Sequence, residues 1–208
     1  MKTVIVNGSP QGNDSITLYT MLYIEKNFPD IEFEILQPGR QIRKMEQDFS
    51  QCRASLESAD LIIFCYPVYT FLVPSQLHRF IELMKENDVK VEGKTATQVT
   101  TSLHFYDITA HRFIEENCKD LGMKYIRGLS ADMEDLLKEK GRKEALAFFR
   151  FVLWNMEGSR VPAQSSSRIA LVADRTGVDG TLGAMIARFK ETYPGDVSIT
   201  DKIGRAHV

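Results

Sequence analysis

The apolar run from Leu61 to Tyr66, LIIFCY, constrains the fold more than any other stretch of this chain. A strand with one face in water would alternate apolar and polar residues, whereas this run is typical of a strand buried on both faces. Such strands occur mainly in parallel sheets that are covered by helices on both sides. We therefore expect this segment to be the central strand of an α/β sheet.

Further apolar runs, rich in β-branched and aromatic residues, alternate with helical patterns along most of the chain. These runs are Thr3–Val6, Ile31–Leu36, Ala96–Thr101 and Lys124–Leu129. The helical patterns span Ser15–Asn27, Arg40–Ser58, Ser75–Lys85, Asp107–Leu121 and Asp132–Met156. This alternation predicts a flavodoxin-like three-layer sandwich with a five-stranded parallel sheet of order 2-1-3-4-5. Ligands of such sheets bind at the carboxyl ends of the strands, here the loops after the first, third and fourth strands.

The composition changes after this first block. Residues 158–167 are rich in Ser, with Gly and Pro, and are interpreted as a linker. A strand–helix–strand pattern then follows at Arg168–Ala173, Leu182–Lys190 and Asp196–Thr200. We expect a flavodoxin-like domain at 1–157 and a partial second α/β unit at 168–202, with a simple C-terminal extension as the alternative. Residues 203–208, IGRAHV, match the translation of a short-read sequencing adapter and are expected to be a non-native tail.

Charge and composition argue against several classes of function. The net charge of −2 offers no basic surface for nucleic acid or an anionic membrane. No apolar run reaches the roughly 18 residues needed to span a bilayer. The N-terminus becomes polar too soon for a signal peptide. The three cysteines lack metal or C-x-x-C spacing, so we expect a cytoplasmic protein without disulfides.

The loop after the first strand combines small polar residues with a helix start. Residues 6–17 read VNGSPQGNDSIT, in which Gly8 permits a sharp turn and Ser9, Ser15 and Thr17 supply hydroxyl groups. The free N–H groups of the following helix and the positive end of its dipole point back at this loop. An anion such as phosphate would fit it without Lys or Arg. Considered alone, the loop is equally consistent with a capped turn that binds nothing.

Two further loops place aromatic residues beside the first. Residues 66–74, YPVYTFLVP, bracket Tyr69 and Phe71 between prolines. Either a flat aromatic ligand, or a neighbouring helix or partner subunit, would cover these rings. Residues 100–106, TTSLHFY, again follow hydroxyl groups with aromatics and would line the far side of the cleft. His104 is a candidate proton donor, although no neighbouring carboxylate supports it and a solvent-facing histidine is favoured.

In combination these motifs resemble the NADPH-dependent FMN reductase family of flavodoxin-like proteins. They are G-S-P at 8–10, Ser15-x-Thr17, Pro67-x-Tyr69, Pro74 and Leu77-x-x-Phe80-Ile81, and the resemblance covers 1–157. It implies FMN as cofactor, with the phosphate on Ser9, Gln11, Ser15, Ile16 and Thr17. It places the isoalloxazine ring against Pro67, Val68, Tyr69, Thr70 and Phe71 on one edge and Thr101, Ser102 and Tyr106 on the other.

The resemblance also implies an activity. The enzyme would pass hydride from NAD(P)H through FMN to a small acceptor such as a quinone, a nitro compound or a flavin, without a catalytic side chain. A homodimer is implied as well. The alternatives are a flavodoxin-type electron carrier and a non-catalytic flavodoxin-like binding domain.

This chain departs from the family pattern at several positions. Gln11 stands where relatives often carry Arg or Lys, which weakens one phosphate contact. Asp14 places a carboxylate beside the expected phosphate, so Asp14→Asn is expected to tighten FMN binding unless the carboxylate turns away to cap the helix. Some relatives bind an iron–sulfur cluster between strands two and three, but Arg40–Ser58 holds only Cys52 and no cluster is expected. In the second unit Asp174–Gly177 replaces G-S-P, and no flavin is expected there.

Overall fold

The computed structural model describes residues 1–102, 107–158, 169–173, 181–192 and 197–201. The chain forms two compact units, Met1–Ser159 and Arg160–Val208. Most of the linker expected at 158–167, and all of the tail expected at 203–208, lie outside the described residues.

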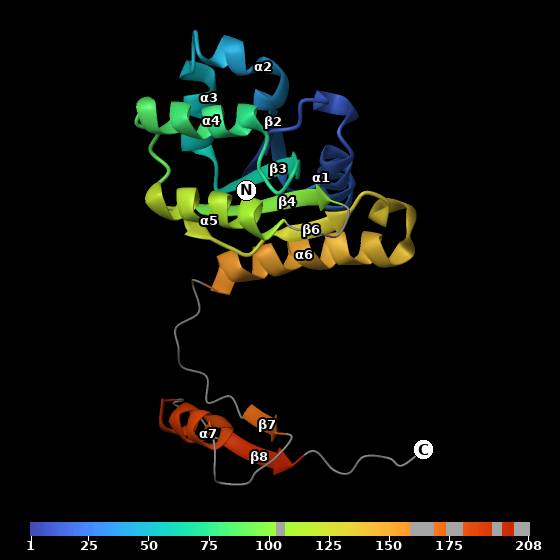
Figure 1. The fold of residues 1–208 in the computed structure, drawn as a ribbon, viewed down its shortest axis with the longest axis vertical. Helices are drawn as coiled ribbons and strands as arrows, with labels where there is room; N and C mark the ends of the chain where they lie inside the picture. The colour runs from blue at the N-terminus through green and yellow to red at the C-terminus, as the bar shows by residue number, and fades with distance from the viewer. Residues whose placement is uncertain (103–106, 159–168, 174–180, 193–196, 202–208) are drawn as a thin grey trace. The chain divides into compact units, whose positions relative to one another are not determined.

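A parallel sheet organises the first unit (Figure 1). Its strands are β1 (Lys2–Asn7), β2 (Glu32–Leu36), β3 (Leu61–Pro67), β4 (Thr95–Ser102), β5 (Lys124–Tyr125) and β6 (Leu129–Asp132). Their order is β2-β1-β3-β4-β5, and β6 pairs with β4 beyond the end of β5. This confirms the predicted flavodoxin-like order.

Helices cover both faces of this sheet, as Figure 1 shows. They are α1 (Ile16–Asn27), α2 (Pro38–Met45), α3 (Ser50–Ser58), α4 (Ser75–Glu86), α5 (Ile108–Asp120) and α6 (Glu139–Gly158). Side chains from α2, α3, α4 and α5 pack into one hydrophobic core, and those from α1 and α6 pack into the other. Strand β3 contributes alternate residues to the two cores, and no residue from Leu61 to Tyr66 is more than 1% exposed. The prediction of a strand buried on both faces is thereby confirmed.

The structure corrects the bounds of three predicted elements. The strand expected at Lys124–Leu129 is divided into β5 and β6, because the chain passes close to β4 at Gly128, where a Cβ would lie 2.4 Å from Gln98 Cγ. The helix expected at Arg40–Ser58 is two helices. They are separated where Phe49 turns into the core, with its ring centroid 5.3 Å from that of Phe80.

The last helix of the first unit begins later than expected. The pattern predicted a start at Asp132, but β6 continues to that residue. A short 3-10 turn, Asp135–Leu137, follows, and the Asp135 carboxylate accepts a hydrogen bond from the Asp132 N–H at 2.7 Å. This local bond holds the chain in a turn, so the helix starts at Glu139.

The second unit contains β7 (Ile169–Ala173), α7 (Thr181–Thr192) and β8 (Val197–Asp201). The two strands pair in parallel. Within the described part of the chain, no helix has the length and apolar character needed to cross a membrane.

We predict that Phe149→Ala destabilises the first unit by about 3–5 kcal/mol, because it leaves a cavity in the core. Phe149 is fully buried on α6, with ring centroids 4.8 Å from Phe28 and 5.8 Å from Phe33. Urea unfolding followed by circular dichroism measures the loss.

Phe151→Ala is the matched control on the same helix. Phe151 is 48% exposed, so a change within about 0.5 kcal/mol is expected. Equal losses in the two variants would contradict the assignment of α6 to this core.

Candidate functional site

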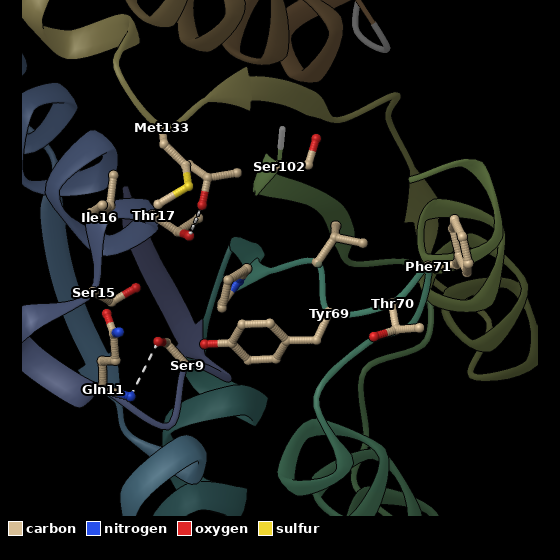
Figure 2. Close-up of a pocket in the computed structure, with 13 residues that line it drawn as sticks. Ser9, Gln11, Ser15, Ile16, Thr17, Tyr69, Thr70, Phe71, Ser102 and Met133 are labelled. Carbon is tan, nitrogen blue, oxygen red and sulfur yellow. Dashed lines mark hydrogen bonds between the residues drawn. The ribbon is translucent and has the colours of Figure 1, made fainter. Parts of the chain in front are cut away.

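A cavity of about 500 Å³ opens at the carboxyl ends of β1, β3 and β4 (Figure 2). Its lining comprises Ser9, Gln11, Ser15, Ile16, Thr17, Pro67, Val68, Tyr69, Thr70, Phe71, Thr101, Ser102 and Met133. Every predicted site residue is among them except Tyr106, which, like His104, lies outside the described residues. The three predicted loops therefore meet at one cavity.

The first loop presents hydrogen-bond donors to this cavity. Ser15 is the N-cap of α1, and its Oγ accepts a hydrogen bond from the Leu18 N–H at 3.4 Å. The N–H groups of Ile16 and Thr17 have no acceptor among the described residues, as is usual in the first turn of a helix. Ser9 Oγ accepts from the Gln11 N–H at 3.3 Å, which leaves its own proton available. This end of the cavity, called the anion end below, therefore carries neutral hydrogen-bond donors at a helix N-terminus, the arrangement that commonly binds anions.

Asp14 is absent from the lining of this cavity, although it directly precedes the N-cap Ser15. Asp14 ends a 3-10 turn, Gly12–Asp14, and faces a separate depression that Gln37 and Arg40 also line. Ser15, not Asp14, caps the helix. The effect of the Asp14 carboxylate on a bound phosphate therefore stays a prediction, tested by Asp14→Asn.

The second loop contains a strained turn. Tyr69 and Leu72 exchange backbone hydrogen bonds of 3.1 and 3.0 Å, and the two residues between them have positive φ, 47° at Thr70 and 70° at Phe71. A turn of this kind strongly prefers Asn and Gly, because side chains with a branched Cβ or a ring are strained at positive φ. Strained residues that line a cavity are typical of ligand-binding loops.

The aromatic side chains of this loop remain partly in solvent. Tyr69 and Phe71 are each 46% exposed, although both line the cavity. Figure 2 shows the Tyr69 hydroxyl pointing across the cavity toward Ser9. Tyr69 therefore extends along the cavity toward the anion end, while its backbone stays at the aromatic end.

The end of β4 joins the three loops. Thr17 Oγ1 and Thr101 Oγ1 share a hydrogen bond of 2.6 Å, and the Val68 N–H donates to the Thr101 carbonyl at 3.0 Å. Ser102 is only 7% exposed, and its Oγ has no hydrogen-bond partner among the described residues. Ser102 thus differs from Thr3 and Thr97, whose buried hydroxyls also have no partner among the described residues, in that it lines the cavity.

Met133 is a lining residue that sequence reasoning missed. It follows β6, whose Asp132 lies in register with Ser102 of β4. Figure 2 shows its side chain reaching toward Ile16 and Thr17. The sequence did not indicate Met133 as a lining residue, because the predicted strand ended at Leu129, three residues before β6 ends.

Burial disfavours the charged forms of three ionisable groups on or beside the elements that carry the cavity. Burial raises the pKa values of Cys65 and Tyr66 far above their ordinary ranges. His111 shares a hydrogen bond of 2.8 Å with Thr100 Oγ1, and its burial lowers its pKa despite the opposing charge of Asp107. The described lining residues include no carboxylate, imidazole or thiol. The cavity thus offers hydrogen bonds and apolar surface, and the chemistry would come from a bound group.

The chain belongs to the NADPH-dependent FMN reductase family. The sequence profile of that family matches residues 1–126, which include all three loops. The protein is therefore an NAD(P)H-dependent flavin oxidoreductase whose cofactors are FMN and NAD(P)H. The predicted family, class of enzyme and cofactors are confirmed.

Solved structures share the fold at low sequence identity. A flavoenzyme NAD(P)H:(acceptor) oxidoreductase from Paracoccus denitrificans aligns with a TM-score of 0.57 and 16% identity, over 75% of this chain and 95% of that one. A flavodoxin from Archaea aligns with a TM-score of 0.55 and 13% identity, over 76% of this chain and 99% of that one. An FMN-dependent NADH-azoreductase from Bacillus anthracis, in complex with FMN, aligns with a TM-score of 0.51 and 13% identity. The alignment covers 76% of this chain and 98% of that one. A search of curated protein sequences gives no significant match.

We predict that the double substitution Thr70→Asn with Phe71→Gly stabilises the unliganded protein by about 1–3 kcal/mol, because it relieves strain at two positive-φ positions. Urea unfolding in the absence of FMN measures the gain. Phe71→Ala is the control, since it removes the ring but keeps a Cβ at positive φ, and no gain is expected from it. A double variant that is less stable than the parent would show that the turn is not strained.

Proposed function

We propose that the cavity at the ends of β1, β3 and β4 binds FMN, with its phosphate at the start of α1 and its ring between the second loop and the end of β4. The observation that carries this proposal is the unpartnered, buried hydroxyl of Ser102 in a cavity whose opposite end holds the free N–H groups of Ile16 and Thr17. These donors stand where a ligand with an anionic end and a polar aromatic end would need them.

The cavity suits FMN in size and in the chemistry of its lining. Its volume of about 500 Å³ is ordinary for a cofactor site. The phosphate would accept hydrogen bonds from the Ile16 and Thr17 N–H groups and from the hydroxyls of Ser9 and Ser15. At the ring end, the Thr70 N–H has no acceptor among the described residues, and Ser102 Oγ adds a second donor.

Bound FMN would accept hydride from NAD(P)H and deliver the reducing equivalents to an acceptor. The protein holds the cofactor and leaves one side of the site accessible. Tyr69 and Phe71 form an apolar rim that remains half exposed, so nicotinamide and acceptor would stack there in turn. The Val68–Thr101 and Thr17–Thr101 hydrogen bonds keep the walls fixed between these two steps.

The acceptor that fits best is a small planar aromatic compound, such as a quinone, a nitro compound, an azo compound or a free flavin. The described lining carries no charged side chain, which favours an acceptor recognised by stacking. Two of the structural neighbours are described as an azoreductase and an NAD(P)H:(acceptor) oxidoreductase, which supports this class.

We also propose a cytoplasmic homodimer. Leu72 follows Tyr69 and Phe71, is 51% exposed and does not line the cavity, so it is apolar surface that a second subunit could cover. All three cysteines are free and buried, which suits a reducing compartment.

We predict that the purified protein is yellow with bound FMN, and that NADPH reduces this FMN at a rate sufficient for turnover with a quinone. An absorbance spectrum and stopped-flow reduction measure the two properties. Flavin that NADPH reduces far more slowly than turnover requires would favour an electron carrier. Protein that neither contains nor binds FMN would favour a non-catalytic domain.

We predict that Ser102→Ala weakens FMN binding about three- to tenfold, the usual effect of one lost hydrogen bond. Thr97→Val is the matched control, because Thr97 Oγ1 is also buried without a partner on β4 but does not line the cavity. Fluorescence titration of FMN measures both variants. An unchanged affinity in Ser102→Ala would place the ring elsewhere.

A further inference from the structure

We infer that Gln37, at the N-terminal end of α2, is a positioning residue that holds the phosphate-binding loop in shape without touching the cofactor. This loop, residues 8–14, is called the cofactor loop below. This inference rests on the proposed FMN site. It concerns a residue that lies 26 positions from Gln11 along the chain and outside the cavity lining.

The Gln37 side chain ties together the two ends of the cofactor loop. Its Oε1 accepts a hydrogen bond of 2.8 Å from Asn7 Nδ2, at the end of β1. Its Nε2 donates a hydrogen bond of 2.8 Å to Asn13 Oδ1, in the 3-10 turn before α1. One amide group therefore uses both its acceptor and its donor to bridge the start and the end of the loop.

Asn7 transmits this constraint into the loop backbone. Asn7 is fully buried, and its Oδ1 accepts from the Ser9 N–H at 3.1 Å while its Nδ2 donates to the Gly12 carbonyl at 3.0 Å. An amide side chain can rotate so that its oxygen and nitrogen exchange places. The Gln37 acceptor, together with the Gly12 carbonyl, holds Asn7 in the orientation in which its oxygen faces Ser9, a residue of the anion end.

The first turn of α2 also lies directly against the loop. A Cβ on Gly39 would lie 2.0 Å from the Ser9 carbonyl oxygen, so only glycine permits this approach. A Cβ on Gly12, which has a φ of 61°, would lie 2.7 Å from Arg40 Cγ, and Arg40 Nη1 donates to the Pro10 carbonyl at 3.4 Å. Gln37 is therefore held on a rigid element in close contact with the loop that it bridges.

This arrangement predicts a selective effect on the phosphate end. The N–H and hydroxyl groups of the loop would bind the phosphate, while the second loop and β4 would bind the ring. Loss of the Gln37 bridge should weaken binding of FMN but leave binding of riboflavin, which lacks the phosphate, almost unchanged. A general loss of stability would not alter the ratio of the two affinities.

The test uses Gln37→Leu in the full-length chain, which keeps the size of the side chain but removes both hydrogen bonds. Fluorescence titration with FMN and with riboflavin gives the two dissociation constants. We expect the FMN constant to rise about tenfold, the effect of about one net hydrogen bond, and the riboflavin constant to change less than twofold. Gln41→Leu is the matched control, since Gln41 lines the same outer depression and its side chain makes no hydrogen bond among the described residues.

A second variant, Asn13→Ala, removes only the exposed hydrogen bond between Gln37 Nε2 and Asn13 Oδ1 and does not disturb the core. We expect it to weaken FMN binding about threefold, again without effect on riboflavin. FMN affinity equal to that of the parent in Gln37→Leu, or equal losses for FMN and riboflavin, would overturn the role of Gln37. A parent protein that binds FMN no better than riboflavin would instead overturn the phosphate site itself.

Discussion

The structure depends on the burial of β3 between two neighbouring parallel strands and two layers of helices. Its side chains alternate between the two cores, with Ile62, Phe64 and Tyr66 on one face and Leu61, Ile63 and Cys65 on the other. A strand of this kind requires cover on both sides, which the helices supply. Parallel pairing with β1 and β4 then brings three carboxyl ends to one edge. The location of the site is a consequence of that pairing.

The cavity is assembled from neutral groups, and its rigidity comes from a few hydrogen bonds between loops. The Gly8 N–H donates to the Cys65 carbonyl at 2.9 Å, and Thr101 joins both the second loop and the first helix. Each link crosses between segments that are distant in sequence. These links hold parts of the first loop, the second loop and β4 to one another, which reduces the conformational entropy lost on binding.

Sequence patterns predicted the strand order and most of the cavity lining, because both follow from local periodicity and from the geometry of parallel sheets. The turn at Thr70 and Phe71 could not be predicted, since neither residue is a usual choice for positive φ. The hydrogen bonds that Gln37 and Arg40 make to the first loop could not be predicted for another reason. Those residues reach the first loop only after β2 and α2 have folded back along β1, and no local pattern reports such a contact. Met133 was missed because the bounds of β6 depend on its pairing with β4.

The hydrogen bond between Thr17 and Thr101 has a further consequence. Two hydroxyl groups share one bond of 2.6 Å, and either oxygen can be the donor. One O–H of the pair is therefore left free, and rotation of the two hydroxyls changes whether that free O–H belongs to Thr17 on the helix or to Thr101 on the strand. The site can thus reverse the polarity of this contact without moving a heavy atom, matching a donor to whichever end of a ligand demands one.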